Sequence, residues 1–179
     1  MKLNISSLLA VLFLFACGSS SGQTDISAQV QLYPTGLIPG VKVDHSVGPH
    51  SRLSLRVGAN IFDHKDLGVQ DSEVGDGLGF SLGYQYYFIE DKTGLHLELK
   101  NDVWWNSVAW VNNEALTSGD TDIIVIQPTI NLGYTFIIGS RVVISPSVGF
   151  GLEWNVRTMG EPTGEGPIGL VGLSAGIRL

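Results

Sequence analysis

From Asp25 to the end of the chain, bulky apolar residues alternate with small or polar ones. The stretch "VVISPSVGFGLEWNV", residues 142–156, shows the pattern most clearly. Its bulky set is Val142, Ile144, Pro146, Val148, Phe150, Leu152, Trp154 and Val156, and the intervening set includes Ser145, Ser147, Gly149, Gly151, Glu153 and Asn155. A period of two residues is typical of a β-strand whose two faces meet different surroundings.

Eight segments of the chain carry this alternation, and turn-forming residues separate them. The 23 glycines and the lack of a long helical pattern also favour β structure. The sequence therefore predicts one all-β domain of eight strands, at residues 25–34, 37–47, 51–62, 77–89, 94–111, 121–138, 141–157 and 167–179.

The connections between these strands alternate in length once the tight first turn is set aside. Those at 48–50, 90–94 and 139–140 are short, whereas those at 63–76, 112–120 and 159–167 are long. Antiparallel up-and-down membrane barrels have short periplasmic turns and longer extracellular loops in this way. An even number of strands places both termini at the periplasmic end. We therefore expect an eight-stranded antiparallel up-and-down transmembrane β-barrel.

The two faces of the strands decide what surrounds the barrel. The interior of eight strands just accommodates side chains, so the Gly- and Ser-rich face suits the lumen. The bulky face then points outward, where only lipid favours a continuous apolar surface, and closure removes strand edges that a bilayer would not tolerate. The inverted arrangement, a soluble lipocalin-like barrel, would overfill its lumen with Ile, Phe and Trp.

Aromatic residues on the outward face gather near both ends of the strands, as the girdles of membrane barrels do. Near the short turns the girdle residues are Tyr84, Tyr86, Phe88, Tyr134 and Phe136, and near the long loops they are Trp105 and Trp154.

Strand number, loop alternation and girdles together make residues 25–179 resemble the small eight-stranded outer-membrane barrels of the OmpA/OmpX type. The last strand, "GLVGLSAGIRL", is similar to their C-terminal assembly signal but ends in Leu179, where the family usually has an aromatic residue. The resemblance implies a Gram-negative bacterial outer membrane. It also implies outer-membrane lipids and the barrel-assembly machinery as partners. We expect a monomer without a cofactor.

The N-terminus, residues 1–22, reads as an export signal. Lys2 precedes the apolar core "LLAVLFLF", which is too short to span a bilayer as a helix. Two cleavage sites stay open: "LFAC" resembles a lipoprotein box, with residues 1–16 removed and Cys17 lipidated, whereas ordinary cleavage near Gly22 would discard Cys17.

The number and placement of charged residues indicate which partners are disfavoured and what fills the lumen. After the signal, nine basic and 17 acidic residues remain, which argues against nucleic acid as a partner. Assigning faces strand by strand predicts an interior ionic network of Lys42, Asp44, Arg52, Arg56, Glu98, Lys100, Asp102, Arg141, Glu153, Arg157 and Arg178. We interpret this network as a plug of ion pairs, with a charged pore as the alternative.

Enzymatic motifs are weak in this chain. "GFSLG", residues 79–83, matches a nucleophile elbow but lies in mid-strand rather than at a strand–turn–helix junction. His45 is predicted on the outward face near a periplasmic turn. We expect no catalytic, cofactor or metal site, and a non-enzymatic role in envelope structure or in surface interaction such as adhesion. A lipid A-modifying barrel enzyme and a narrow channel are the alternatives.

Several strands exceed the roughly 9–11 residues that span a membrane. The segments at 94–111, 121–138 and 141–157 are the long ones, and their excess should project outward as a sheet. An exposed strand edge can bind a partner by strand addition, so we expect a surface partner, if there is one, at these extended strands.

Overall fold

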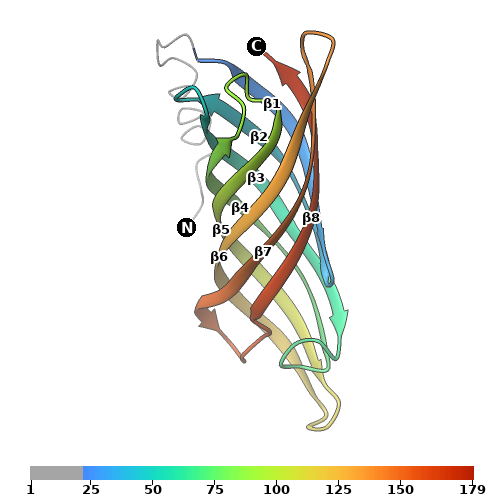
Figure 1. Cartoon of the computed structure of the whole chain (residues 1–179). Coiled ribbons are helices and arrows are strands. Elements are labelled where there is room, and N and C mark those ends of the chain that lie inside the picture. Colours follow the sequence, from blue (N-terminus) through green and yellow to red (C-terminus); the bar gives the residue numbers. More distant parts are fainter. Residues whose placement is uncertain (1–21) are drawn as a thin grey trace.

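The computed structural model describes residues 22–179, which form eight antiparallel strands in a closed ring (Figure 1). Each strand pairs with its neighbours in sequence, and β1 pairs with β8 to close the barrel. The predicted fold class is therefore confirmed. The strands are β1 (Thr24–Tyr33), β2 (Gly36–Ser46), β3 (Ser51–Lys65), β4 (Ser72–Tyr87), β5 (Gly94–Asn112), β6 (Thr117–Ile138), β7 (Val142–Met159) and β8 (Gly166–Arg178).

The signal-peptide and lipidation predictions, including Cys17, lie outside the described residues. Between Gly22 and Leu179, no helix is long and apolar enough to cross a membrane.

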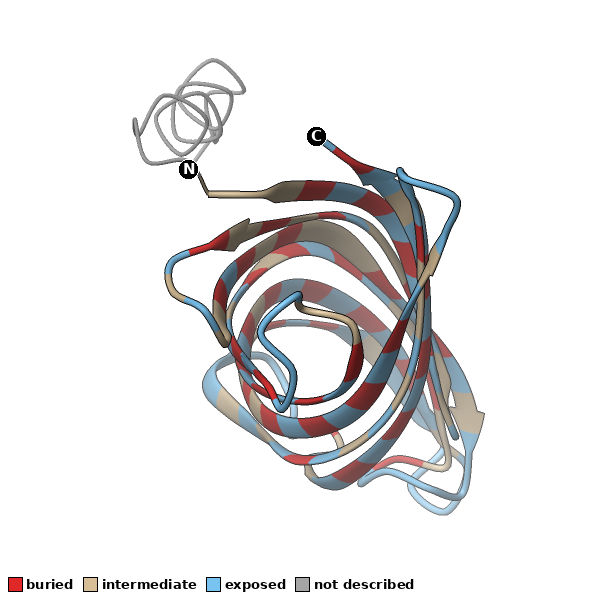
Figure 2. Cartoon of the chain, turned by 45° about the horizontal axis from the view of Figure 1, so that its top comes forward, coloured by how far each residue is buried: buried red, intermediate tan, exposed pale blue. Residues whose placement is uncertain are grey.

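The period-two pattern becomes two faces of one wall. Figure 2 shows buried and exposed residues alternating along most of the strands, while β7 alternates mainly between intermediate and exposed residues. On β6, for example, Asn131 is buried inside the barrel while Ile130 and Leu132 are exposed outside. Successive side chains of a strand point to opposite faces, so the sequence alternation alone produces an apolar exterior.

The apolar belt on the exterior has a sharp edge. On neighbouring strands β3 to β6, Ile61 pairs with Asp76, Asp76 with Ser107, and Ser107 with Asp122. The two carboxylates and the serine of this row are exposed on the outer face. Charged side chains on the lipid face are costly in mid-bilayer and tolerated near the interface. The row therefore marks one boundary of the lipid-facing belt.

The two ends of the barrel differ mainly in strand length. We call the end where Asp25 pairs with Arg178 the inner end, and the opposite end the outer end. At the outer end β5 and β6, of 19 and 22 residues, form the hairpin that reaches furthest (Figure 1). Strands extend into segments predicted as loops, which leaves connections of 66–71, 113–116 and 160–165. These strand ends were not recognised because, beyond the apolar belt, water replaces lipid and the alternation fades.

The lumen is filled in two layers. The inner half holds polar and charged side chains, described below. The outer half holds an apolar cluster that the sequence pattern did not predict: Ile38, Phe62, Trp104, Val108, Ile123, Val125, Ile168 and Leu170. Trp104 lies where the layers meet, with the Arg56 guanidinium carbon 5.4 Å from its ring centre. Its indole N–H donates to Gln127 Oε1 at 3.1 Å.

The orientation of the barrel is testable with single cysteines. We expect cysteine at Leu116 or Glu161, both exposed at the outer end, to react with a membrane-impermeant maleimide on intact cells. Cysteine at Pro49 or Ser140, at the inner end, should react only after the cells are broken. The unsubstituted protein, whose single cysteine is Cys17, is the control. Labelling of the inner-end positions on intact cells would reverse the topology.

Candidate functional site

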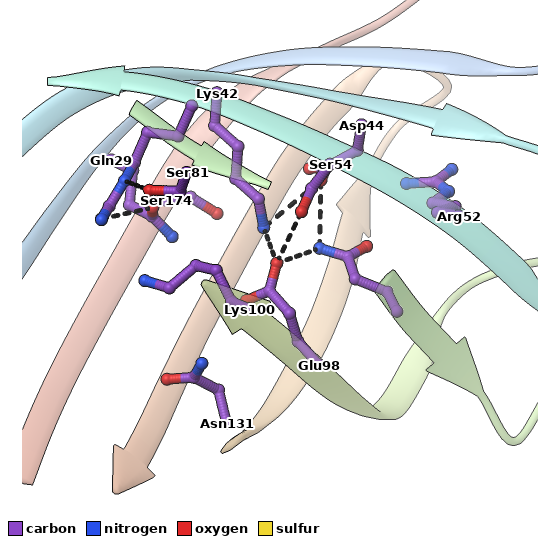
Figure 3. A network of polar contacts seen from close by, with 12 residues as sticks. Gln29, Lys42, Asp44, Arg52, Ser54, Ser81, Glu98, Lys100, Asn131 and Ser174 are labelled. Atoms are coloured by element: carbon purple, nitrogen blue, oxygen red, sulfur yellow. Dashed lines mark hydrogen bonds and ion pairs between the residues drawn. The ribbon is translucent and has the colours of Figure 1, made fainter. Parts of the chain in front are cut away.

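A network of ion pairs spans the inner half of the lumen. Lys42 on β2 places Nζ 2.9 Å from Glu98 Oε1 and 3.3 Å from Asp44 Oδ1 (Figure 3). Asp102 on β5 pairs with two cations, Arg56 Nη2 at 2.9 Å and Lys100 Nζ at 3.2 Å. All of these side chains are almost fully buried. Because they come from β2, β3 and β5, they connect walls of the barrel that the backbone ladder does not join directly.

Amides and hydroxyls complete the partners of these charges. Gln85 Nε2 donates to both Asp44 and Glu98, at 3.0 and 3.1 Å, and Ser54 Oγ donates to Glu98 at 3.0 Å. Lys100 Nζ donates to Gln31 Oε1 at 2.8 Å. Buried charges persist when they are paired and hydrogen-bonded, which is the condition met here.

A second ionic cluster lies at the inner end. Asp25 on β1 accepts from Arg52 on β3 and from Arg178 on β8, whose Nε lies 2.9 Å from Oδ1. The turn at 88–93 covers this cluster, and Arg178 Nη2 donates to the Lys92 carbonyl. Partial burial, together with the charges of Arg52 and Arg178, lowers the pKa of Lys92 in that turn. Asp25 was absent from the predicted network, although it shares the odd-numbered parity of the inward residues Ser27 and Gln29.

Of the eleven charged residues predicted inside the lumen, eight lie there and are buried: Lys42, Asp44, Arg52, Arg56, Glu98, Lys100, Asp102 and Arg178. The prediction was wrong for Arg141 and Arg157, which are exposed. Arg141 belongs to the turn after β6 rather than to a strand face. Arg157 follows an irregularity at which Ile124 pairs with Arg157 but Val125 pairs with Asn155, so Val156 is an extra residue. A bulge of this kind reverses the parity of the faces beyond it.

Glu153 also departs from the prediction. It is half-buried in the outer half of the lumen and has no ion-pair partner among residues 22–179. Its charged neighbours are the carboxylates of Glu165 and Glu73. The ion pair expected of Glu153 as a member of the plug is therefore absent from residues 22–179.

Glu73 organises the outer mouth of the barrel. It accepts from the backbone amides of Val69 and Gly164, both at 3.0 Å, and lies 3.4 Å from His64 Nε2. The connection 160–165 is thereby held against the connection 66–71. Thr121 Oγ1 adds a bond to the Glu161 carbonyl at 3.1 Å. Sequence reasoning placed Glu73 in the long connection 63–76, because neither loop has a pattern that predicts its folding over the mouth.

A cavity of about 240 Å³ lies beneath these loops at the outer mouth. Its floor is the apolar cluster, represented by Phe62, Val108 and Ile168, and its wall includes Tyr33, His64, Asn106 and the three glutamates described above. In the described part of the chain, no group of three or more His, Cys, Asp or Glu is arranged to hold a metal ion.

The girdle residues occupy the outer surface. All seven are 42–53% exposed: Tyr84, Tyr86, Phe88, Trp105, Tyr134, Phe136 and Trp154. The other two tryptophans, Trp104 and Trp110, are buried inside the barrel.

The two residues considered for catalysis make structural contacts. Ser81, in the middle of β4, accepts a hydrogen bond from Arg56 Nε at 3.0 Å. His45 Nδ1 lies 2.9 Å from Thr24 Oγ1 on the neighbouring strand. The two side chains thus have separate partners.

Comparison with known proteins finds similar folds among solved outer-membrane barrels. No family model matches the chain, and no curated protein matches its sequence. The N-terminal β-barrel domain of Pseudomonas aeruginosa OprF is similar in structure, with a TM-score of 0.52, 16% identity, and coverage of 89% of this chain and 100% of that one. Ail, the attachment invasion locus protein of Yersinia pestis, in complex with the heparin analogue sucrose octasulfate, has a TM-score of 0.53 at 11% identity and the same coverage.

A major outer membrane protein from Thermus thermophilus matches with a TM-score of 0.58, 13% identity, and again 89% and 100% coverage. Similarity at these identities shows the fold alone. The chain has the fold of the small eight-stranded outer-membrane β-barrels, as the sequence pattern predicted.

The inner ionic cluster yields a stability prediction. Asp25→Ala leaves the buried guanidinium groups of Arg52 and Arg178 without their carboxylate. Breaking a buried ion pair in this way costs about 3–5 kcal/mol of the free energy of unfolding. Asp25→Asn, which keeps an acceptor, should cost less. Urea unfolding of the barrel in lipid vesicles, followed by the gel-mobility shift of the folded form, measures both.

The matched control is Asp91→Ala, which removes an exposed carboxylate from the turn at the same end. We expect it to unfold at the urea concentration of the parent. If Asp25→Ala also matched the parent, the inner cluster would contribute nothing to holding the barrel together.

Proposed function

We propose that this protein is a non-enzymatic outer-membrane barrel of the bacterial cell surface whose projecting hairpin binds a partner. In this proposal residues 1–22 are the export signal, residues 25–179 form a monomeric barrel, and Cys17 is either lipidated or removed. The observation that carries the proposal is a free strand edge. β6 pairs with β5 from Thr117 onward, but its pairing with β7 begins only at Asp122.

Residues 117–119 of β6 therefore present backbone groups on the side that faces away from β5, whereas Thr121 is buried and bonds to the connection 160–165. Such an edge binds an extended segment by strand addition, in which main-chain hydrogen bonds supply the affinity. Thr117 and Ser118 are exposed at this edge, and Asp120 is exposed next to it. Exposed polar and charged residues also keep the edge from joining indiscriminately with other strands.

The charge of the hairpin indicates the kind of partner. Glu114, Asp120 and Asp122 are exposed on it, and residues 101–140 contain no Lys or Arg. An extended segment rich in Lys or Arg would meet complementary charge here, which favours encounter. The structure of Ail contains a heparin analogue, a polyanion, but the acidic hairpin of this chain does not favour such a ligand.

The lumen supports a role without transport or catalysis. A paired ionic layer and an apolar layer lie in series along it, and eight strands leave little further width. Ser81 and His45 have separate structural partners. These contacts weigh against both alternatives, the narrow channel and the lipid-modifying enzyme.

Shortening the hairpin tests the proposal. Replacing residues 109–120 with Asn-Gly closes the hairpin at the pair Val108–Thr121 and removes the free edge. We expect the barrel to fold, because the apolar cluster keeps Val108 and Ile123. Binding of an alternating Lys-Val octapeptide to the barrel in nanodiscs, measured by interferometry, should weaken by about tenfold or more.

The charge-reversal variant Asp120→Lys should weaken binding of the same peptide, whereas Asp91→Lys, at the inner end, should not. Equal affinity of the peptide for the parent and the shortened barrel would contradict the assignment of the partner site to the β6 edge.

A further inference from the structure

The cavity at the outer mouth has the properties of a small binding site. It lies inside the barrel wall beneath the connection 160–165, which Glu73 and Asn155 hold in place. Asn155 Nδ2 donates to Thr163 Oγ1 and to the Gly164 carbonyl, at 3.3 and 3.2 Å. Thr163 is buried beneath this connection. Because the loop is bonded on both sides, the cavity has a defined shape.

The charged residues that line the cavity are acidic. Glu73, Glu153 and Glu165 line it together with His64, and none of its lining residues is Lys or Arg. Glu73 accepts hydrogen bonds from backbone amides and lies beside His64, and Glu165 Oε2 accepts from the backbone N–H of Asn155 at 2.9 Å. Glu153 alone of the three has no ion pair or hydrogen bond within the described chain. A partly buried carboxylate of this kind favours a cationic partner.

A second polar group in the same cavity is also without a partner. Asn106 on β5 is only 3% exposed and lines the cavity. Neither its Oδ1 nor its Nδ2 has a hydrogen-bond partner among residues 22–179. Leaving a buried amide unpaired costs about 1–3 kcal/mol, so such a group in a cavity indicates a ligand that bonds to it.

The apolar floor of the cavity is unsuited to a bare metal ion. Phe62, Val108, Ile123 and Ile168 close the cavity from below, and the Tyr33 ring forms part of its side. Side chains of this kind solvate a compact apolar group and an adjacent organic cation, whereas a divalent cation needs several oxygens in a tight shell. The cavity is also slightly smaller than the roughly 300–1,000 Å³ of sites for drug-sized molecules.

We propose that the outer mouth binds a small organic cation, a primary ammonium group attached to a compact apolar body. Glu153 pairs with the ammonium, Asn106 Oδ1 accepts a second of its hydrogen bonds, and the apolar body rests on Phe62 and Ile168. This site is separate from the β6 edge and takes a different class of ligand.

Benzylamine is the probe that tests the site. Calorimetry on the parent barrel in nanodiscs should show saturable binding of benzylamine, and binding of the uncharged benzyl alcohol should be weaker by about tenfold or more. Glu153→Gln and Asn106→Leu should each weaken benzylamine binding, the former by about tenfold. The matched control Glu161→Gln, which changes an exposed glutamate of the same connection, should bind as the parent does.

Folding of each variant is checked by the gel-mobility shift. Glu153→Gln should stay folded, since it removes a carboxylate that has only acidic charged neighbours. If Asn106→Leu fails to fold, Glu153→Gln decides alone. Benzylamine binding that is absent, that equals benzyl alcohol binding, or that survives Glu153→Gln unchanged would overturn the proposal. Displacement of benzylamine by equimolar Ca²⁺ would also overturn it, because the site would then recognise charge alone.

Discussion

Closure of the backbone ladder is the constraint on which the rest of this structure depends. A strand in lipid must satisfy every backbone N–H and C=O within the protein, and a closed barrel achieves this without free edges. Here the ring closes where β1 pairs with β8, and Asp25 on β1 binds Arg178 across that seam and Arg52 of β3 on its other side. Once the ring is closed, each strand must present one face to lipid and the other to a narrow lumen.

The period of two in the sequence is a direct consequence of that division, which is why fold class, strand number and girdles could be predicted. The alternation no longer predicted strands where the outer face passes from lipid into water. Beyond the row of Asp76 and Asp122 the outer face meets water, so the tips of β3, β4 and β6 lacked the alternation that identifies a strand.

The alternation also could not predict a β-bulge or the partners of individual side chains. The extra residue Val156 turns Arg157 outward, and nothing in the local composition indicates it. The partners of the lumen charges depend on which strands face each other across the barrel, so Glu153 could not be recognised as unpaired. The orphaned amide of Asn106 and the loop contacts of Glu73 depend on tertiary packing in the same way.

The two halves of the lumen differ in how their charged side chains are paired. Every charged side chain of the inner ionic layer has an opposite charge within 4 Å, and these pairs link strands across the lumen behind the apolar cluster. At the outer mouth, the Glu153 carboxylate has no ion pair and the Asn106 amide has no hydrogen bond within residues 22–179, and the free edge of β6 projects at the same end. The two proposed recognition surfaces thus lie at one end of the barrel, above a filled interior.

The central claim is that the bulky face of every strand lies against lipid and the other face lines the lumen. The four tryptophans test it directly, because Trp105 and Trp154 lie outside whereas Trp104 and Trp110 lie inside. The measurement is fluorescence quenching by lipids brominated on their acyl chains, in four variants that each keep one tryptophan and replace the others with Phe. The account predicts strong quenching of Trp105 and Trp154 and little quenching of Trp104 and Trp110. Strong quenching of Trp104 together with little quenching of Trp105 and Trp154 would mean that the barrel is inside out.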